Sequence, residues 1–142
     1  MHTATVTIAS LSPYSPSRYH GIPRENKETA HDHEERTWRE RCHFTYGGGV
    51  FIPPMAFKGC LADGAKFKSV QIPGKGKATY TKHFKSGVLV IDGLPLDANK
   101  ETVEGEWLFL NADGVRGSGK RVMKCYPKIE EWGGEVIFHI LD

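Results

Sequence analysis

Hydrophobic and polar residues alternate along several short stretches of this chain, which is the pattern of half-buried β-strands. Residues 3–9 are rich in β-branched side chains, and their alternation predicts a strand with Val6 and Ile8 facing the core. Further strands are predicted at residues 50–52, 88–91, 106–111, 121–126 and 135–141.

Residues 37–45 fit two patterns. Apolar and polar side chains alternate there, which predicts a strand whose outer face carries Arg39, Arg41 and His43. A helix that begins near Asp32 is the alternative. The glycines at positions 47–49 would end either element.

A helix is predicted over residues 55–67, because the two prolines before it suit a first helical turn. Phe57 and Leu61 lie four residues apart on one stripe and are expected to be buried, while Lys58 is expected to be exposed. Gly59 and Gly64 each weaken a helix by up to about 1 kcal/mol relative to alanine. This cost suggests that the two glycines allow close packing.

The chain has 142 residues, of which 39% are hydrophobic, so we expect a single folded domain with its own core. Helices together with strands indicate the α+β class. Residues 10–36 combine prolines, serines and charges without periodicity and are expected to form a long exposed loop. The three cysteines are widely spaced and odd in number, which favours reduced, mostly buried thiols.

Positive charge is concentrated in one part of the chain, although the formal net charge is only +2. No Asp or Glu occurs between Gly64 and Ile91, and a basic loop is expected at about residues 66–86. Its cations would meet phosphates and its aromatic rings would stack on unpaired bases. The candidate binding residues here are Lys66, Lys68, Lys75, Lys77, Tyr80, Lys82 and His83.

A second basic group lies in the glycine-rich stretch at residues 112–120, which is expected to be a hairpin tip. It adds Arg116, Lys120 and Arg121 to the candidate binding residues. Its Gly-x-Gly-Lys resembles part of a phosphate-binding loop, but the full GxxxxGK[ST] motif is absent. Nucleotide hydrolysis is therefore not expected.

Metal binding and catalysis have less support. His31, His33, Cys42 and His43 are possible zinc ligands, but their spacing matches no zinc signature, so neither a metal nor another cofactor is expected. His20, His83 or His139 could serve as a general acid or base in RNA cleavage. No local motif supports any of the three, so no catalytic residue is assigned.

Residues 50–61, Val-Phe-Ile-Pro-Pro-Met-Ala-Phe-Lys-Gly-Cys-Leu, resemble a segment of the repeat-associated mysterious proteins, the RNA-binding subunits of CRISPR effector complexes. That segment reads h-I-P-G-S-S-h-K-G-x-h-R, where h is hydrophobic. The matching positions are Ile52, Pro53, Phe57, Lys58, Gly59 and Leu61. The resemblance implies a ferredoxin-like, RRM-like half with additional antiparallel strands. It also implies that Lys58 lies near an RNA backbone and that the lysine-rich segment is a protruding loop that contacts guide RNA.

These observations lead to an expected function, the non-catalytic binding of single-stranded nucleic acid, RNA above all, by a compact relative carried by a phage or mobile element. One alternative is an anti-CRISPR protein that inhibits an effector complex through protein contacts, by mimicking a subunit or a nucleic acid. A metal-independent ribonuclease is the third. The first nine residues lack a secretory signal pattern and no apolar run approaches about 20 residues, so a cytoplasmic protein without a membrane partner is expected.

Overall fold

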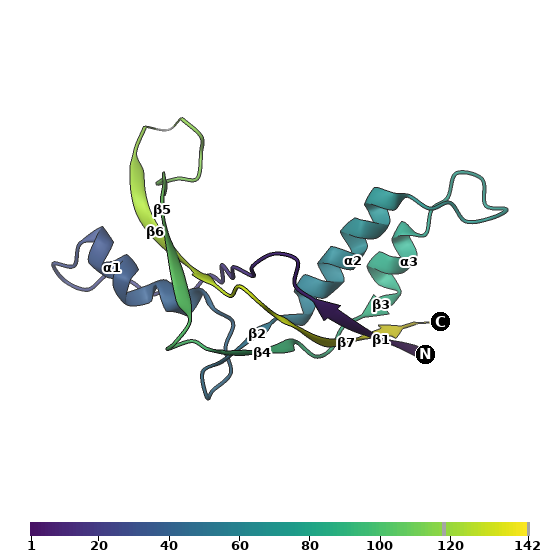
Figure 1. Ribbon diagram of the computed structural model, residues 1–142. Coiled ribbons are helices and arrows are strands. Elements are labelled where there is room, and N and C mark those ends of the chain that lie inside the picture. Colours follow the sequence, from purple (N-terminus) through teal and green to yellow (C-terminus); the bar gives the residue numbers. More distant parts are fainter. Residues whose placement is uncertain (118, 142) are drawn as a thin grey trace. The chain divides into compact units, whose positions relative to one another are not determined.

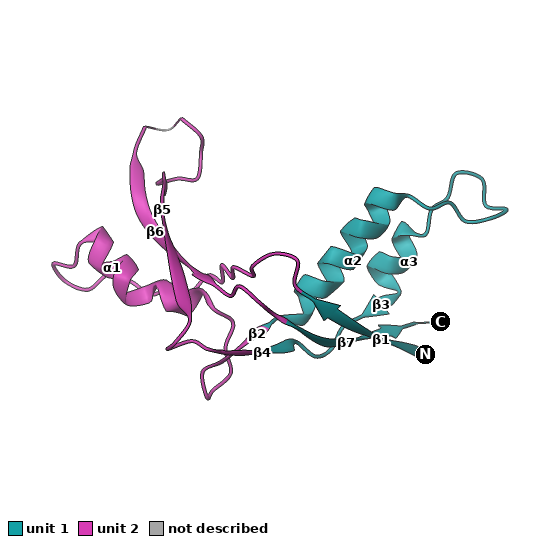
Figure 2. Cartoon of the chain, in the orientation of Figure 1, with its two compact units in different colours: residues 1–9, 52–95, 133–142 teal, residues 10–51, 96–132 magenta. Residues whose placement is uncertain are grey.

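The computed structural model describes residues 1–117 and 119–141 (Figure 1). Within them the chain forms three α-helices, one short 3-10 helix and seven β-strands. The sheets are antiparallel and open, so the predicted α+β class is confirmed. The chain, for which one domain is expected, divides into two compact units (Figure 2). No helix in the described ranges is long and apolar enough to cross a membrane.

Unit 1 comprises residues 1–9, 52–95 and 133–141 and contains a three-stranded sheet in the order β1–β7–β3. The strands are β1 (His2–Ala9), β7 (Gly133–Ile140) and β3 (Val88–Leu89). β1 pairs along its whole length with β7, whereas β3 contributes two residues to the other edge of β7. Helices α2 (Pro54–Lys68) and α3 (Thr81–Ser86) lie side by side, with their connecting loop beyond the ends of both (Figure 1).

Unit 2 comprises residues 10–51 and 96–132. It contains helix α1 (Ala30–Thr37), the 3-10 helix η1 (Trp38–Arg41) and an antiparallel hairpin. The hairpin strands are β5 (Glu104–Asn111) and β6 (Arg121–Lys128), which pair over eight residues each. A further two-stranded sheet pairs β2 (Gly49–Ile52) with β4 (Leu94–Asn99), and the division between the units falls within both strands.

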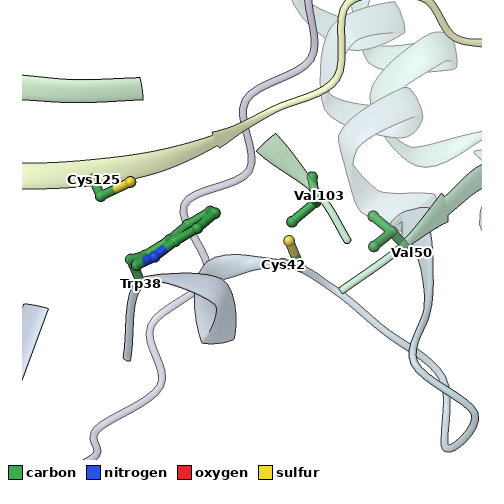
Figure 3. Packing of buried hydrophobic residues seen from close by; sticks show 5 residues of the cluster. All are labelled: Trp38, Cys42, Val50, Val103 and Cys125. Carbon is green, nitrogen blue, oxygen red and sulfur yellow. The ribbon is translucent and has the colours of Figure 1, made fainter. Parts of the chain in front are cut away.

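The core of unit 2 is a small cluster of buried side chains from four parts of the chain. Trp38, Cys42, Val50, Val103 and Cys125 form it, and Figure 3 shows the Trp38 ring beside the two cysteines. Burial raises the pKa of both Cys42 and Cys125 to about 11, so both thiols are neutral at pH 7. All three cysteines are free, but Cys60 is exposed.

Helix α2 confirms the predicted helix almost residue for residue. Pro54 occupies its first turn, and the helix is capped by Ser69, whose φ of 46° places it in the left-handed region. Its burial differs from the prediction. Phe57 and Leu61 are half-buried rather than buried, and Lys58 is half-buried rather than exposed. For Phe57 and Leu61 the reason is that α2 packs mainly on the short α3, which leaves none of the residues of α2 buried.

The expected close packing at Gly59 and Gly64 is wrong. A Cβ built at either position meets no heavy atom within 4 Å outside the helix backbone and the adjacent residues. The two glycines therefore cost helix stability without allowing another segment to approach.

The predicted strand at residues 37–45 is also wrong, and the helical alternative is closer to the structure. Thr29 caps α1, because its hydroxyl accepts from the Asp32 N–H while the Asp32 carboxylate accepts from the Thr29 N–H. Glu34, Thr37 and Trp38 are buried together, which is a helical spacing. Arg41 consequently points inward, with its side chain 12% exposed, rather than lying on an outer face.

The two expected loops are not loops throughout. The last seven residues of the stretch at 10–36 belong to α1, and its Glu34 is buried. The basic stretch at 66–86 begins in the last turn of α2 and ends in α3, so the connecting loop itself covers residues 69–80. Of the predicted core residues of β1, Ile8 is half-buried and Val6 is 40% exposed.

Candidate functional site

The basic segment, defined here as residues 66–85 of unit 1, is a helix end, an ordered loop and a second short helix. The loop is closed by backbone hydrogen bonds, among them Tyr80 N–H to Val70 O at 3.0 Å and Ile72 N–H to Ala78 O at 2.8 Å. Gly74 and Gly76 have positive φ angles, which the tight tip requires. The tip thereby presents Lys75 and Lys77, both exposed.

The lysines of this segment have no acidic partner among residues 1–117 and 119–141. All of them are exposed, and none forms an ion pair within the described residues. They are Lys66, Lys68, Lys75, Lys77, Lys82 and Lys85. Lys58, in the same unit, also has no ion-pair partner there. A group of unpaired cations on one unit creates a positive potential that attracts anionic partners.

Aromatic rings accompany these cations. Phe67 is 91% exposed, Tyr80 37% and Phe84 36%. The Tyr80 ring lies 5.8 Å from the His83 ring between centroids, which places two flat groups together at the start of α3. Exposed rings next to lysines are the combination that binds unpaired bases and the phosphates between them.

The second predicted group lies at the tip of the β5–β6 hairpin in unit 2. Arg116, Lys120 and Arg121 are exposed there. Arg121 is held in place, because it donates to Phe109 O at 2.8 Å and its guanidinium carbon lies 4.7 Å from the Phe109 ring centroid. Ser118, within the predicted tip, lies outside the described residues. The two basic groups therefore belong to different units.

The possible zinc ligands are not brought together. His31 stacks near Trp107 with 5.3 Å between ring centroids, His43 lies near Phe51, and Cys42 is in the core. Within residues 1–117 and 119–141, no group of three or more His, Cys, Asp or Glu could hold a metal ion. The histidines considered for catalysis are divided as well, since His83 and His139 belong to unit 1 and His20 to unit 2.

Unit 2 contains a pocket that the sequence did not reveal. Its volume is about 560 Å³, and one wall is the irregular segment at residues 17–23. The other walls come from α1, η1 and β6, which contribute His33, Glu34, Arg41, Lys124 and Tyr126. Lys124 lies 83 residues from Arg41 in the chain, so no local motif could have linked them.

A buried carboxylate organises this pocket. Glu34 is 2% exposed and accepts hydrogen bonds from two nitrogens of Arg41, from Lys124 Nζ at 3.2 Å and from the Cys125 N–H at 2.9 Å. Burial alone would raise the pKa of Glu34, but these hydrogen bonds and the two positive charges outweigh it and lower that pKa. Arg41 Nη1 also donates to Cys125 O at 2.8 Å, which ties η1 to β6.

Two histidines line the same pocket. The Ile22 N–H donates to His20 Nδ1 at 3.1 Å, and His33 Nε2 lies 2.7 Å from Ile22 O. The ring centroids are 6.3 Å apart. Burial lowers the pKa of His20, and the charges of Arg41, His33 and Arg18 lower it further, against the opposing effect of Glu34. In the neutral form the proton is on Nε2, because Nδ1 accepts from Ile22.

Sequence reasoning thus found the exposed lysines but missed the pocket residues Arg18, Glu34, Arg41 and Lys124. The signal that could have found part of it is the helical spacing of Glu34, Thr37 and Trp38, which places a carboxylate on a buried face. Comparisons with protein-family models, with curated proteins and with solved structures found no match to this chain.

Proposed function

We propose that this protein binds single-stranded RNA without cleaving it, through the basic segment of unit 1. One observation carries the proposal: the six exposed lysines at residues 66–85 have no acidic partner within the described residues and stand among exposed aromatic rings. Lysines neutralise backbone phosphates and release their counterions, which is the main source of affinity for nucleic acids.

Single strands are favoured over duplexes because of the aromatic side chains. Phe67, Tyr80 and Phe84 offer faces on which unpaired bases can stack, whereas the bases of a duplex are already stacked. The exposed arginines and lysine of the β5–β6 tip give unit 2 a basic group of its own.

The family resemblance supports the proposal through local structure. Residues 50–61 form most of β2, a proline turn and the start of α2. In the family that this segment resembles, a proline turn likewise leads from a glycine-flanked strand into the first helix. The proposal therefore includes a ferredoxin-like half built on unit 1, and a compact phage or mobile-element relative of the CRISPR RNA-binding subunits. Lys58 would then lie near the RNA backbone.

The same lysines would also suit an acidic protein surface, so an anti-CRISPR protein that inhibits an effector complex is the second candidate. The exposed, unpaired lysines support this candidate as well, but their ligand would be an acidic protein surface instead of RNA. The ribonuclease remains the third candidate, and cleaved RNA in a binding experiment would favour it.

The test removes charge and stacking separately. A variant with Lys75→Gln, Lys77→Gln and Lys82→Gln is titrated with labelled oligouridine at several salt concentrations, beside the unchanged protein. For single strands, log K falls with log salt at about −0.7 per neutralised phosphate, so losing three contacts flattens the slope by about two units. Tyr80→Ala should instead weaken binding by ~1–3 kcal/mol with little change in slope.

The matched control loses three positive charges from unit 2, through Arg24→Gln, Lys27→Asn and Lys128→Gln. It changes the net charge equally and should leave the slope nearly unchanged. If the salt dependence became equally flatter in both triple variants, net charge, and not the basic segment, would determine binding. Retention of an effector complex by the unchanged protein and not by the lysine variant, without RNA binding, would favour the protein inhibitor.

A further inference from the structure

The pocket of unit 2 carries more positive than negative charge. Arg18, Arg41 and Lys124 line it together with one carboxylate, Glu34, so these four side chains carry a net charge of +2. Glu40 lies 3.8 Å from Arg18, but it is closer to Lys100, at 2.7 Å. A dianion would balance the charge of the lining.

Several N–H donors in the pocket remain unused. Lys124 Nζ has three protons and donates one, to Glu34. Arg41 donates three of its five, to Glu34 and Cys125 O, and its Nε–H has no acceptor within the described residues. His20 accepts at Nδ1, so the neutral ring carries its proton on Nε2, for which the described part of the chain supplies no acceptor. These donors on a half-covered, positively charged wall suit the oxygens of a phosphate group.

The pocket also has an aromatic face. Tyr19, a residue that is 90% exposed, lines it, and its ring makes no contact with another aromatic ring in the described part of the chain. The pocket volume of about 560 Å³ is within the range of small-ligand sites, about 300–1,000 Å³. The site thus combines a net positive charge that a dianion would balance, N–H donors that are not used within the protein, and an aromatic ring on which a base can stack.

We infer that this pocket binds a nucleotide through its terminal phosphomonoester, with Lys124 and Arg41 on the phosphate and Tyr19 against the base. A phosphomonoester carries close to two negative charges at pH 7, which matches the lining, whereas an internal phosphodiester carries one. The site lies entirely within unit 2 and is independent of the basic segment. Its ligand is either a free mononucleotide or the phosphorylated end of a strand.

The experiment measures binding of uridine 5′-monophosphate, inorganic phosphate and uridine by calorimetry at pH 7. The monophosphate is expected to bind most tightly and uridine least. Lys124→Gln should weaken the binding of the monophosphate and of inorganic phosphate about tenfold or more, because it removes a charge-assisted hydrogen-bond donor. Tyr19→Ala should weaken the binding of the monophosphate about tenfold and leave the binding of inorganic phosphate unchanged.

The matched control is Lys128→Gln, four residues further along β6 and outside the pocket lining, which should bind as the unchanged protein does. Arg41 is left in place because it holds Glu34. Tryptophan fluorescence checks that each variant is folded.

Hexauridine with a 5′-phosphate or a 5′-hydroxyl distinguishes the two sources of the phosphate. A preference for the phosphorylated strand that Lys124→Gln abolishes indicates a strand end. No such preference, with mononucleotide binding intact, indicates a free nucleotide. Phosphate and monophosphate affinities that are immeasurable, or equal in Lys124→Gln and Lys128→Gln, overturn the site. A Tyr19→Ala variant that binds the monophosphate normally overturns the base contact and with it the nucleotide.

Discussion

Glu34→Gln is expected to lower the free energy of unfolding of unit 2 by about 3–5 kcal/mol. The carboxylate is 2% exposed and is the counterion of Arg41, whose side chain is 12% exposed. Removing one member of a buried ion pair leaves the other charged group without compensation, and this is the origin of the cost. Urea unfolding followed by tryptophan fluorescence measures it, since Trp38, Trp107 and Trp132 all belong to unit 2.

Glu35→Gln is the matched control, because the neighbouring carboxylate is exposed and makes no hydrogen bond or ion pair within the described residues. Its unfolding free energy should stay within about 0.5 kcal/mol of the unchanged protein. If both variants unfold at the same urea concentration as the unchanged protein, the Glu34 network does not stabilise unit 2.

The ion pair between Glu34 and Arg41 also leads us to expect that stability depends on pH. The pKa of Glu34 is lowered in the folded protein from its ordinary value of 4.5, so the folded state keeps the carboxylate ionised to lower pH than the unfolded state does. The stabilisation is present above the unfolded value and is lost as the pH falls through the folded one. The difference between the unchanged protein and Glu34→Gln should therefore shrink below about pH 4.5.

Gly105→Ala is expected to have the second large effect, lowering the free energy of unfolding by about 1–3 kcal/mol. A Cβ at this position would lie 2.5 Å from Cys125 Sγ and 2.8 Å from Cη2 and Cζ3 of the Trp38 ring. Both neighbours are buried in the core cluster, so neither can move without disturbing the packing. The measurement is the same urea unfolding, and the emission of Trp38 is expected to change with the displaced ring.

Gly47→Ala is the control for this substitution in the same unit. A Cβ there meets no heavy atom within 4 Å, and its φ is not in the left-handed region. Its stability should change by no more than about 0.5 kcal/mol. Equal stability of the two variants would show that the Trp38 ring does not lie against β5 as described.

The sequence predicted those elements whose local pattern agrees with their final environment. Helix α2 has a proline start and an apolar stripe, β1 and β7 contain several β-branched residues, and β5 contains Trp107 and Phe109. α3 was missed because six residues without an apolar stripe carry no helical period. β4 was missed because Pro95 near its start argues against a strand.

The candidate site was predictable to the extent that it depends on neighbouring residues. An acid-free run of lysines is visible in the sequence, and the exposure of its lysines follows from their charge. The pocket depends on Glu34 being buried, which contradicts the usual exposure of glutamate, and on Lys124, which comes from a distant strand. Such a site forms through tertiary contacts that no local spacing encodes.

The most direct test of the central claim is a titration of the unchanged protein with labelled single-stranded oligouridine, in low salt and at rising salt concentrations. Affinity should be highest in low salt, the plot of log K against log salt should be linear with a slope of about −0.7 for each phosphate contacted, and the RNA recovered afterwards should be intact. Absence of binding at the lowest salt concentration would contradict the proposed RNA-binding function.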